Sequence, residues 1–232
     1  MAIASKVGRT GSRGEPEKTR AAILKSALEE FAQEGVTGAR TDEIARRAGV
    51  NKALLYYYFK DKEGLYAAAL EQVFSGLHDR VMQVLDNHAL PPRERLLKYV
   101  AAHFDYISDA PLYPRLVQRE FMRGAGKTLS PVAGRILERF GKPIYTKLAT
   151  LVSDGIESGD FRKVDPWNAV TSMLGLITFY FISLPAQQVL LPGDPASPER
   201  VASRRAAVLD FVTAAVLPPP SVPANQREKR QT

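Results

Sequence analysis

The stretch that decides the fold is Thr41-Asp-Glu-Ile-Ala-Arg-Arg-Ala-Gly-Val-Asn-Lys-Ala-Leu-Leu-Tyr-Tyr-Tyr-Phe-Lys-Asp-Lys62. It predicts one short helix, a tight turn, a second short helix and the start of a third. Ile44 and Ala48 lie four residues apart, on one apolar face of the first helix. Gly49 follows where a residue of positive φ commonly ends a helix, and Asn51 is a preferred N-cap for the next one. This order of elements is that of a helix-turn-helix.

The second short helix has an unusual outer face. If Leu55 and Phe59 face inward, a rotation of about 100° per residue points Tyr57 directly outward. The positions beside it on that face are Ala53, Leu54 and Tyr56. Such a face suits a DNA groove, where aromatic hydroxyls reach phosphates and apolar groups meet base edges and thymine methyls. Periodicity alone also allows a small helical domain whose tyrosines pack against a neighbour.

Lys62 supports the DNA interpretation. It follows Asp61, the expected N-cap of the third helix. A cation in the first turn opposes the helix dipole, and a nearby phosphate would reverse that penalty.

The segment Gly49 to Phe59, followed by Lys62-Glu63 and Leu65, resembles the recognition segment of the TetR family of bacterial transcriptional regulators. Upstream, the same pattern is matched by Phe31, Gly35, Thr41, Ile44-Ala45 and Ala48-Gly49. The resemblance covers roughly the first third of the chain. It implies DNA contacts from Asn51, Lys52, Leu54, Tyr56 and Tyr57, with Thr41 and Lys62 holding phosphates.

Three positions depart from the family pattern. The usual Ser or Thr cap, four residues before Ile44, is Arg40 here, and Thr41 lies one place later. Tyr58 stands where a His is common, and Leu54 stands where a small polar residue is common. The last two departures predict a change in the bases that are read.

In the rest of the sequence, apolar residues recur at spacings of three and four, a pattern that predicts further helices. The expected helices cover about 17–34, 62–85, 93–108, 113–122, 130–158, 165–188 and 197–217. With the two short helices, they predict an all-α protein of about nine helices. Its expected parts are a disordered basic N-terminal arm (1–16), a helix-turn-helix DNA-binding domain (17–62), a connecting helix (63–90), a ligand-binding and dimerisation domain (91–217) and a disordered tail (218–232).

The helices at 165–188 and 197–217 are more apolar than a single inward face requires, which predicts a partner surface. The resemblance implies a homodimer in which these two helices of each chain form a four-helix bundle. Such a dimer would place two recognition helices about one DNA turn apart, on a near-palindromic double-stranded operator. The alternative is that both apolar stripes are internal core.

Composition narrows the other classes. The chain has 232 residues and no cysteine, which excludes disulfides, thiolate zinc sites and a Cys nucleophile. No signal peptide is visible at the start, and the longest apolar run, Ala169–Leu184, includes hydroxyl side chains and is short for a membrane span. We therefore expect a cytoplasmic, nucleoid-associated protein without a membrane partner. The net charge is +7, but most of the excess lies in residues 1–14 and 218–232, so charge alone does not indicate DNA binding.

No enzyme chemistry, metal site or cofactor is expected. Gly124-Ala-Gly-Lys-Thr128 resembles a phosphate loop, but the first glycine of that motif would fall on Phe121 and no strand precedes it. A helix–helix loop fits better. His78, His88 and His103 lack metal-ligand spacing, and no nucleophile elbow is present.

The middle helices carry polar groups among apolar ones, which predicts an effector pocket of unidentified specificity. Its candidates are His103, Phe104, Tyr106, Arg119, Glu120, Met122, Tyr145, Met173 and Tyr180. Arg119 and Glu120 could equally form an ordinary surface pair, and His103 could be a polar group of the core.

The sequence thus predicts a ligand-responsive homodimeric regulator, a repressor released from its operator by a small molecule. The alternative from another class is a helical adaptor whose tyrosine face docks on a protein and shows no sequence preference on DNA. An enzyme using the pocket is a third hypothesis, for which the sequence supplies no nucleophile, base or metal site.

Overall fold

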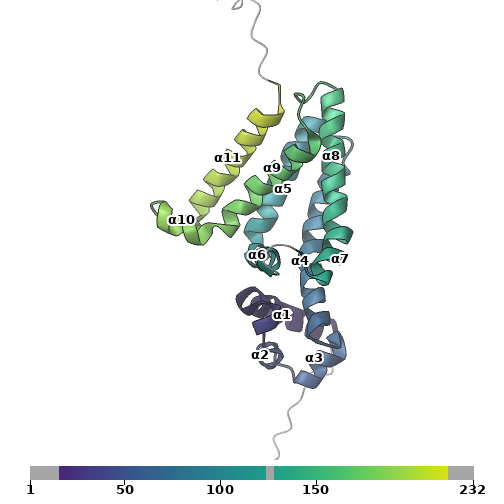
Figure 1. Ribbon diagram of the computed structural model, residues 1–232, viewed down its shortest axis with the longest axis vertical. Coiled ribbons are helices and arrows are strands. Elements are labelled where there is room, and N and C mark those ends of the chain that lie inside the picture. Colours follow the sequence, from purple (N-terminus) through teal and green to yellow (C-terminus); the bar gives the residue numbers. More distant parts are fainter. Residues whose placement is uncertain (1–15, 124–127, 219–232) are drawn as a thin grey trace, which may run out of the picture. The chain divides into compact units, whose positions relative to one another are not determined.

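The computed structural model describes residues 16–123 and 128–218, and these residues form helices and turns without a strand (Figure 1). The helices are α1 (Pro16–Gly38), α2 (Thr41–Arg47), α3 (Lys52–Phe59), α4 (Lys62–Leu85), α5 (Pro92–Asp109), α6 (Tyr113–Met122), α7 (Pro131–Ile136), α8 (Lys142–Glu157), α9 (Pro166–Ile182), α10 (Leu184–Leu190) and α11 (Pro198–Val216), with a π-helical turn η2 (Leu137–Gly141). The all-α prediction is confirmed.

Two predicted long helices depart from a regular α-helix, each next to a proline. The predicted helix 130–158 is helical from Pro131 to Glu157 but contains the π-helical turn η2, next to Pro143 at the start of α8. The predicted helix 165–188 bends by 70° between α9 and α10, where Pro185 is the second residue of α10. Proline has no N–H to donate to the preceding turn, and its ring crowds the carbonyl four residues back. A single continuous helix was therefore the wrong prediction for 165–188, whereas 130–158 stays helical through its π-helical turn.

The end of α1 also differs from the prediction. Gly35 leaves the helical region at φ 68° and ψ 173°, as expected of a helix-ending glycine. The chain then makes a further helical turn to Gly38, where the sequence predicted only a loop. Ala39 N–H donates to the Gly35 carbonyl oxygen at 3.0 Å, so this turn keeps a backbone hydrogen bond.

The chain divides into two compact units. The first unit combines the residues up to Phe74 with Arg115–Ile136, and the second combines Ser75–Pro114 with the residues from Leu137 onward. The core of the first unit is built from buried side chains of α1 to α4, namely Ile23, Ala27, Phe31, Ile44, Leu55, Phe59, Leu65 and Leu70. The unit limits cross α4 and α6, so they differ from the predicted domain limits, which stay a prediction.

Helix α5 is central to the second unit. It packs against α8, α9 and α11, and α9 also contacts α8 and α11. The core residues there are Leu96, Tyr99, Val100, Phe104, Leu148, Val152, Val170, Ile177, Val208 and Val212. Helix α10 forms the turn that joins α9 to α11 (Figure 1).

Among the described residues, no single helix has both the length and the apolarity to cross a membrane. Helices α9 and α10 reach those values only when they are taken together, across their 70° bend.

Candidate nucleic-acid interface

The turn between α2 and α3 has the predicted geometry. Gly49 adopts φ 68°, and nothing lies within 4 Å of a Cβ built on it, so its conformation rather than space requires glycine. Val50 N–H closes the turn by donating to the Ala45 carbonyl oxygen at 3.0 Å. Asn51 then caps α3, because its side-chain oxygen accepts the Leu54 N–H at 2.7 Å. These bonds set the direction in which α3 leaves the turn.

Helix α3 buries one face and exposes aromatic groups on the other. Leu55 and Phe59 are buried, as the periodicity predicts. Tyr57 has 81% of its surface exposed and Tyr56 has 36%, while Leu54 is half-buried. The predicted outward direction of Tyr57 and the buried positions of Leu55 and Phe59 are therefore confirmed.

Thr41 and Tyr56 are brought together from α2 and α3. The Thr41 hydroxyl lies 3.2 Å from the Tyr56 hydroxyl, and either oxygen can donate. Thr41 is buried, whereas the Tyr56 ring lies at the surface. The sequence predicted a phosphate contact for Thr41, and the structure places its hydroxyl where it orients the Tyr56 phenol.

The two predicted lysines are also held by the protein. Lys52 Nζ donates to the Asp42 carboxylate at 2.9 Å, a hydrogen bond that raises the pKa of Lys52. Lys62 Nζ donates to the Thr37 carbonyl oxygen at 3.1 Å. Asp61 caps α4 as predicted, accepting the Gly64 N–H at 2.6 Å. Both ammonium groups thus have defined positions in the first unit.

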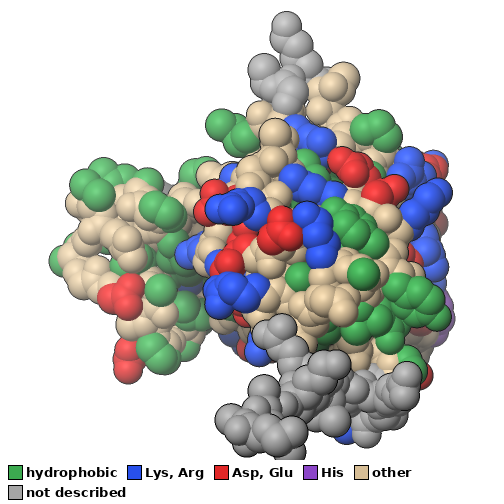
Figure 2. Space-filling model, turned by 90° about the horizontal axis from the view of Figure 1, so that it is seen from below, with side chains coloured by type: hydrophobic (Ala, Val, Ile, Leu, Met, Phe, Trp, Pro, Cys, Tyr) green, Lys and Arg blue, Asp and Glu red, His purple; other side chains and the backbone are tan. Residues whose placement is uncertain are grey.

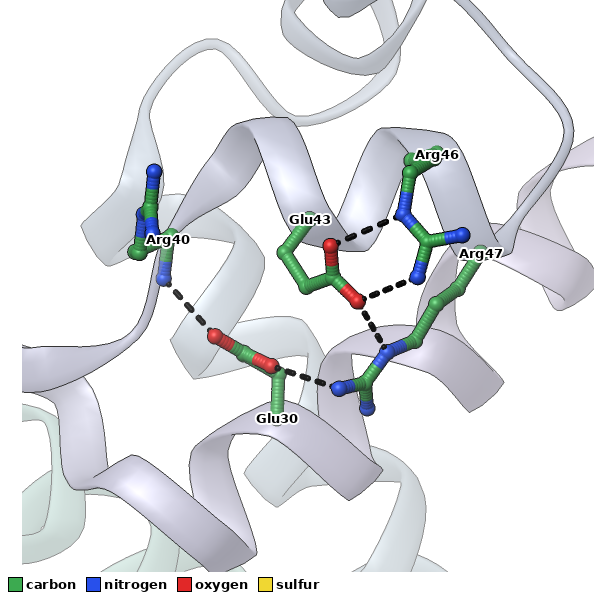
Figure 3. Close-up of polar contacts among 5 residues, drawn as sticks. All are labelled: Glu30, Arg40, Glu43, Arg46 and Arg47. Atoms are coloured by element: carbon green, nitrogen blue, oxygen red, sulfur yellow. Dashed lines mark hydrogen bonds and ion pairs between the residues drawn. The ribbon is translucent and has the colours of Figure 1, made fainter.

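A cluster of charged side chains joins α1 to α2, and sequence reasoning missed it (Figure 3). Glu43 accepts hydrogen bonds from Arg46 at 2.6 and 2.9 Å and from Arg47 at 2.8 Å. These bonds, those of Arg46 first, lower the pKa of Glu43 to about 2. Glu30 of α1 accepts the Arg40 backbone N–H at 3.0 Å and lies 3.4 Å from the Arg47 guanidinium.

The sequence carried one signal for Glu30, because this carboxylate lies beside Ala27 and Phe31 on the apolar face of the predicted helix. In the structure, Ala27 and Phe31 are completely buried and Glu30 is 3% exposed. A carboxylate among core positions normally has partners, because burying an unpaired charge is costly. Those partners lie on another helix, so periodicity could not name them.

Charge is mixed on the face of the molecule that Figure 2 presents. Figure 2 shows basic, acidic and apolar side chains interspersed on the face that it presents. Residues 15–62 carry nine Lys and Arg against eight Asp and Glu. Sequence preference in DNA binding would therefore depend on particular side chains rather than on a uniform positive field.

Three candidates for the effector pocket belong to the first unit. Arg119 Nε donates to the Ala32 carbonyl oxygen at 2.8 Å, and its guanidinium also contacts the Gln33 carbonyl oxygen. The buried Glu120 carboxylate accepts hydrogen bonds from the Tyr66 hydroxyl and, at 2.7 Å, from Ser130. Met122 is exposed. Arg119 and Glu120 therefore contact different partners, and their place in a pocket stays a prediction.

His103 is the most deeply buried polar candidate of the second unit. Its Nδ1 lies 2.9 Å from the Tyr99 hydroxyl, while its Nε2 is buried without a hydrogen-bond partner. Burial lowers the pKa of His103 to about 4. Phe104 lies beside it in sequence and packs its ring against Phe181, with centroids 5.0 Å apart.

The remaining candidates are spread over the second unit. Tyr106 is half-buried, and its hydroxyl would lie 2.7 Å from a Cβ added to Gly76. Tyr145 stacks on Trp167 with ring centroids 5.6 Å apart. Tyr180 is buried and donates to the Pro195 carbonyl oxygen. Met173 lines a groove of about 280 Å³ between α9 and α11. Their role in ligand binding stays a prediction.

Other predictions fall partly outside the described residues. Gly124-Ala-Gly-Lys-Thr128 is described only at Thr128, and the predicted arm and tail are described only at Pro16 and Pro218. In the ranges 16–123 and 128–218, no group of three His, Asp or Glu side chains is placed to hold a metal ion.

Comparison with protein families decides the classification. Residues 23–69 match the model described as bacterial regulatory proteins, tetR family. Residues 92–212, more than half of the chain, match the tetracyclin repressor-like C-terminal domain. The chain belongs to the TetR family. It is a helix-turn-helix transcriptional regulator, and the family resemblance seen in its recognition segment is confirmed.

Individual relatives agree with this TetR-family assignment. The HTH-type transcriptional regulator RutR of Escherichia coli (strain K12) is 30% identical over 149 residues, which are 64% of this chain and 67% of RutR. The HTH-type transcriptional repressor SCO4008 of Streptomyces coelicolor is 31% identical over 77% of this chain and 86% of its own. The fold is shared with AibR, solved in complex with isovaleryl coenzyme A and operator DNA, at a TM-score of 0.67 and 20% identity over 84% of this chain and 97% of AibR.

Proposed function

We propose that this TetR-family protein is a homodimeric repressor that binds a near-palindromic operator and releases it when a small molecule binds in residues 91–217. The observation that carries the proposal is the exposed Tyr57 on α3, a helix fixed by the Asn51 cap and the buried Leu55 and Phe59. An exposed phenol at the centre of a recognition helix suits the edge of a base or a phosphate.

The proposed DNA contacts divide into two kinds. Leu54 and Tyr57 from the outer face of α3, and Asn51 from its N-cap position, read base edges and thymine methyls, because they lack a fixed charge. The cationic Lys52 and Lys62, together with the Tyr56 hydroxyl, hold phosphates, and Thr41 acts through Tyr56. Phosphate contacts set register and orientation, whereas base contacts choose the sequence.

The proposed dimer uses α9 and α11. Exposed aromatic side chains lie on both helices, with 54% of Trp167, 68% of Phe179 and 57% of Phe211 accessible. Large apolar groups at a surface support association, since burying aromatic side chains dominates interface energetics. Two copies paired through these helices would present two recognition helices to half-sites about one DNA turn apart.

The proposed switch is a shift between two populations of the dimer. In one population, the two recognition helices of the dimer have the spacing that fits DNA, and in the other they do not. An effector that binds more tightly to the second population increases it and so lowers the affinity of the dimer for DNA. AibR, which was solved in complex with both isovaleryl coenzyme A and operator DNA, supports a ligand-responsive design for this fold. The effector of the present protein is a small molecule of unassigned class, and a cytoplasmic location is part of the proposal.

The test is selection from a random duplex DNA pool at near-physiological salt, over several rounds. We expect enrichment of a near-palindrome whose half-sites are about one helical turn apart. Sequence-blind binding that disappears with added salt would contradict the proposal. That result would favour the adaptor hypothesis, in which the Tyr57 face contacts a protein.

A further inference from the structure

Helix α2 begins without a cap of its own. Its N-cap residue is Arg40, in an extended conformation with φ −111° and ψ 115°, and the Arg40 side chain makes no capping hydrogen bond. A helix start leaves backbone N–H groups without intrahelical partners, and a Ser, Thr, Asp or Asn side chain normally accepts one of them. Arg40 has no acceptor atom in its side chain, so α2 lacks local capping at its N-terminus.

A carboxylate from another helix occupies this position. Glu30 of α1 is 3% exposed, and its Oε1 accepts the Arg40 backbone N–H at 3.0 Å. In a capping box, the third residue of the helix reaches back to the N-cap N–H in the same way. Glu30 therefore supplies from α1 one half of a capping box.

The same carboxylate also contacts the other end of α2. Glu30 Oε2 lies 3.4 Å from the guanidinium of Arg47, the last residue of that helix. Figure 3 shows Glu30 beside α2, with Arg40 toward one end and Arg47 toward the other. Arg47 is fixed in turn by Glu43, at 2.8 Å. One buried carboxylate thus holds the two ends of a seven-residue helix.

The anchored end of α2 carries the supports of α3. Thr41 and Asp42 follow Arg40 directly, and they bond the Tyr56 hydroxyl at 3.2 Å and the Lys52 ammonium at 2.9 Å. A displacement of the first turn of α2 would therefore move two side chains expected at the DNA. The path from Glu30 to α3 runs within the first unit, through the hydrogen bond to Arg40, the backbone from Arg40 to Asp42, and the hydrogen bonds of Thr41 and Asp42 to α3.

We propose that Glu30 is a positioning residue of the DNA reader: from α1, its carboxylate binds the N-cap N–H of α2 as the third residue of a capping box would, and through Arg47 it fixes the helix that holds Tyr56 and Lys52. The inference rests on the proposed DNA-binding function, but its structural half can be tested without DNA. It also explains how the chain accommodates Arg40 at a position where its family usually has a capping Ser or Thr.

The DNA-free experiment is amide hydrogen exchange of the full chain, followed residue by residue in α2. Glu30→Gln keeps an acceptor for Arg40 N–H but removes the charge that attracts Arg47, whereas Glu30→Leu removes both contacts. We expect Glu30→Leu to speed exchange throughout α2, and Glu30→Gln to speed it mainly toward Arg47. Arg47→Met should reproduce the Glu30→Gln pattern. Unchanged exchange in Glu30→Gln and Arg47→Met would overturn the inference even if Glu30→Leu does not fold.

The DNA-binding experiment uses the selected operator and a scrambled duplex at the same salt. Glu30→Leu should weaken operator binding at least roughly fivefold, the factor that loss of a helix cap implies. It should also reduce the preference for the operator over the scrambled duplex, which a uniform loss of folded protein would leave unchanged. Wild-type affinity and preference in a folded Glu30→Leu protein would overturn the positioning role.

Rescue completes the test. Arg40→Ser introduces a local cap, and Arg40→Ala is its control for the lost positive charge. The double variant Glu30→Leu/Arg40→Ser should recover slow exchange in the first turn of α2, whereas Glu30→Leu/Arg40→Ala should not. If the wild-type chain selects no DNA sequence, the proposed function fails while these exchange results still decide the capping role.

Discussion

Arg119 of α6 donates from Nε to the Ala32 carbonyl oxygen of α1 at 2.8 Å, across 87 positions of the sequence. Its guanidinium also contacts the Gln33 carbonyl oxygen, close to the point where Gly35 breaks α1. The last carbonyl groups of a helix have no intrahelical partner. Arg119 thus acts as a C-terminal cap for the first part of α1.

Replacing Arg119 by Met should destabilise the protein by about 1–3 kcal/mol, because hydrogen bonds from a charged donor are lost and carbonyl groups are left without that donor. Urea unfolding at pH 7 measures the change. Arg115→Met, a substitution of an exposed arginine on the same helix, is the matched control and should change stability by less than about 0.5 kcal/mol. Equal stabilities of the two variants would contradict the capping role of Arg119.

Asp42→Asn should strengthen DNA binding. The Asp42 carboxylate engages Lys52 at 2.9 Å, and the substitution removes a negative charge from the proposed interface while its amide oxygen still offers Lys52 a hydrogen-bond acceptor. We expect a severalfold gain at low salt that shrinks as salt rises, because the gain is electrostatic. Titrations of a fluorescent operator at several salt concentrations measure it. Asp154→Asn in α8 makes the same charge change, and an equal gain there would refute the explanation.

Substitution of Lys62 should have the effect expected of a lost phosphate contact. Lys62→Met removes a proposed phosphate contact, so it should weaken binding to every duplex and reduce the salt slope by about one. A change in sequence preference without a change in slope would show that Lys62 does not act as a phosphate contact. Since Lys62 also bonds the Thr37 carbonyl oxygen, thermal unfolding of the variant must be recorded in parallel.

His103 should make stability depend on pH. Its pKa is lowered to about 4 in the folded chain, below its ordinary value of 6.5. As pH falls below 6.5, the unfolded chain binds a proton that the folded chain does not bind until about pH 4. Stability is therefore lost between these values, by about 3 kcal/mol at most, and this residue causes no further loss below them.

The measurement is the difference in unfolding free energy between wild type and His103→Gln at pH 7.5 and pH 4.5. Protonation of carboxylates affects both proteins and cancels in the difference. An identical pH dependence in wild type and His103→Gln would contradict burial of a neutral imidazole at this position.

Phe179→Ser and Phe211→Ser should weaken the proposed dimer, because each removes an exposed aromatic group from α9 or α11. Analytical ultracentrifugation should show a dissociation constant raised at least roughly tenfold. Val189→Ser on α10 is the control, since its side chain is 86% exposed but lies outside α9 and α11. A monomeric wild-type chain, or a dimer that is insensitive to both substitutions, would exclude this interface.

Local sequence patterns correctly predicted α3 and the turns on either side of it. Gly49, Asn51 and Asp61 have their expected conformation or capping bonds, because each signal acts within four residues of itself. The outward direction of Tyr57 follows from the helical period alone, once Leu55 and Phe59 are placed in the core.

Contacts between helices could not be predicted from the sequence. Glu30 with Arg40 and Arg119 with Ala32 join groups that no periodic pattern relates, and their geometry depends on how the helices pack. The break at Pro185 was readable, since proline disfavours a continuous helix, but the apolar pattern running through it outweighed that signal. The pocket candidates had no local signature, so only the burial and bonding of their side chains could be established.

Tyr57→Ala is the most direct test of the proposal that the exposed face of α3 recognises a DNA sequence. The measurement is the affinity of wild type and variant for the selected operator, with oligomeric state and thermal unfolding recorded on the same samples. We expect the Tyr57→Ala variant to bind the operator at least roughly tenfold more weakly than wild type, with its fold and oligomeric state unchanged. Unchanged operator affinity in the folded variant would contradict it.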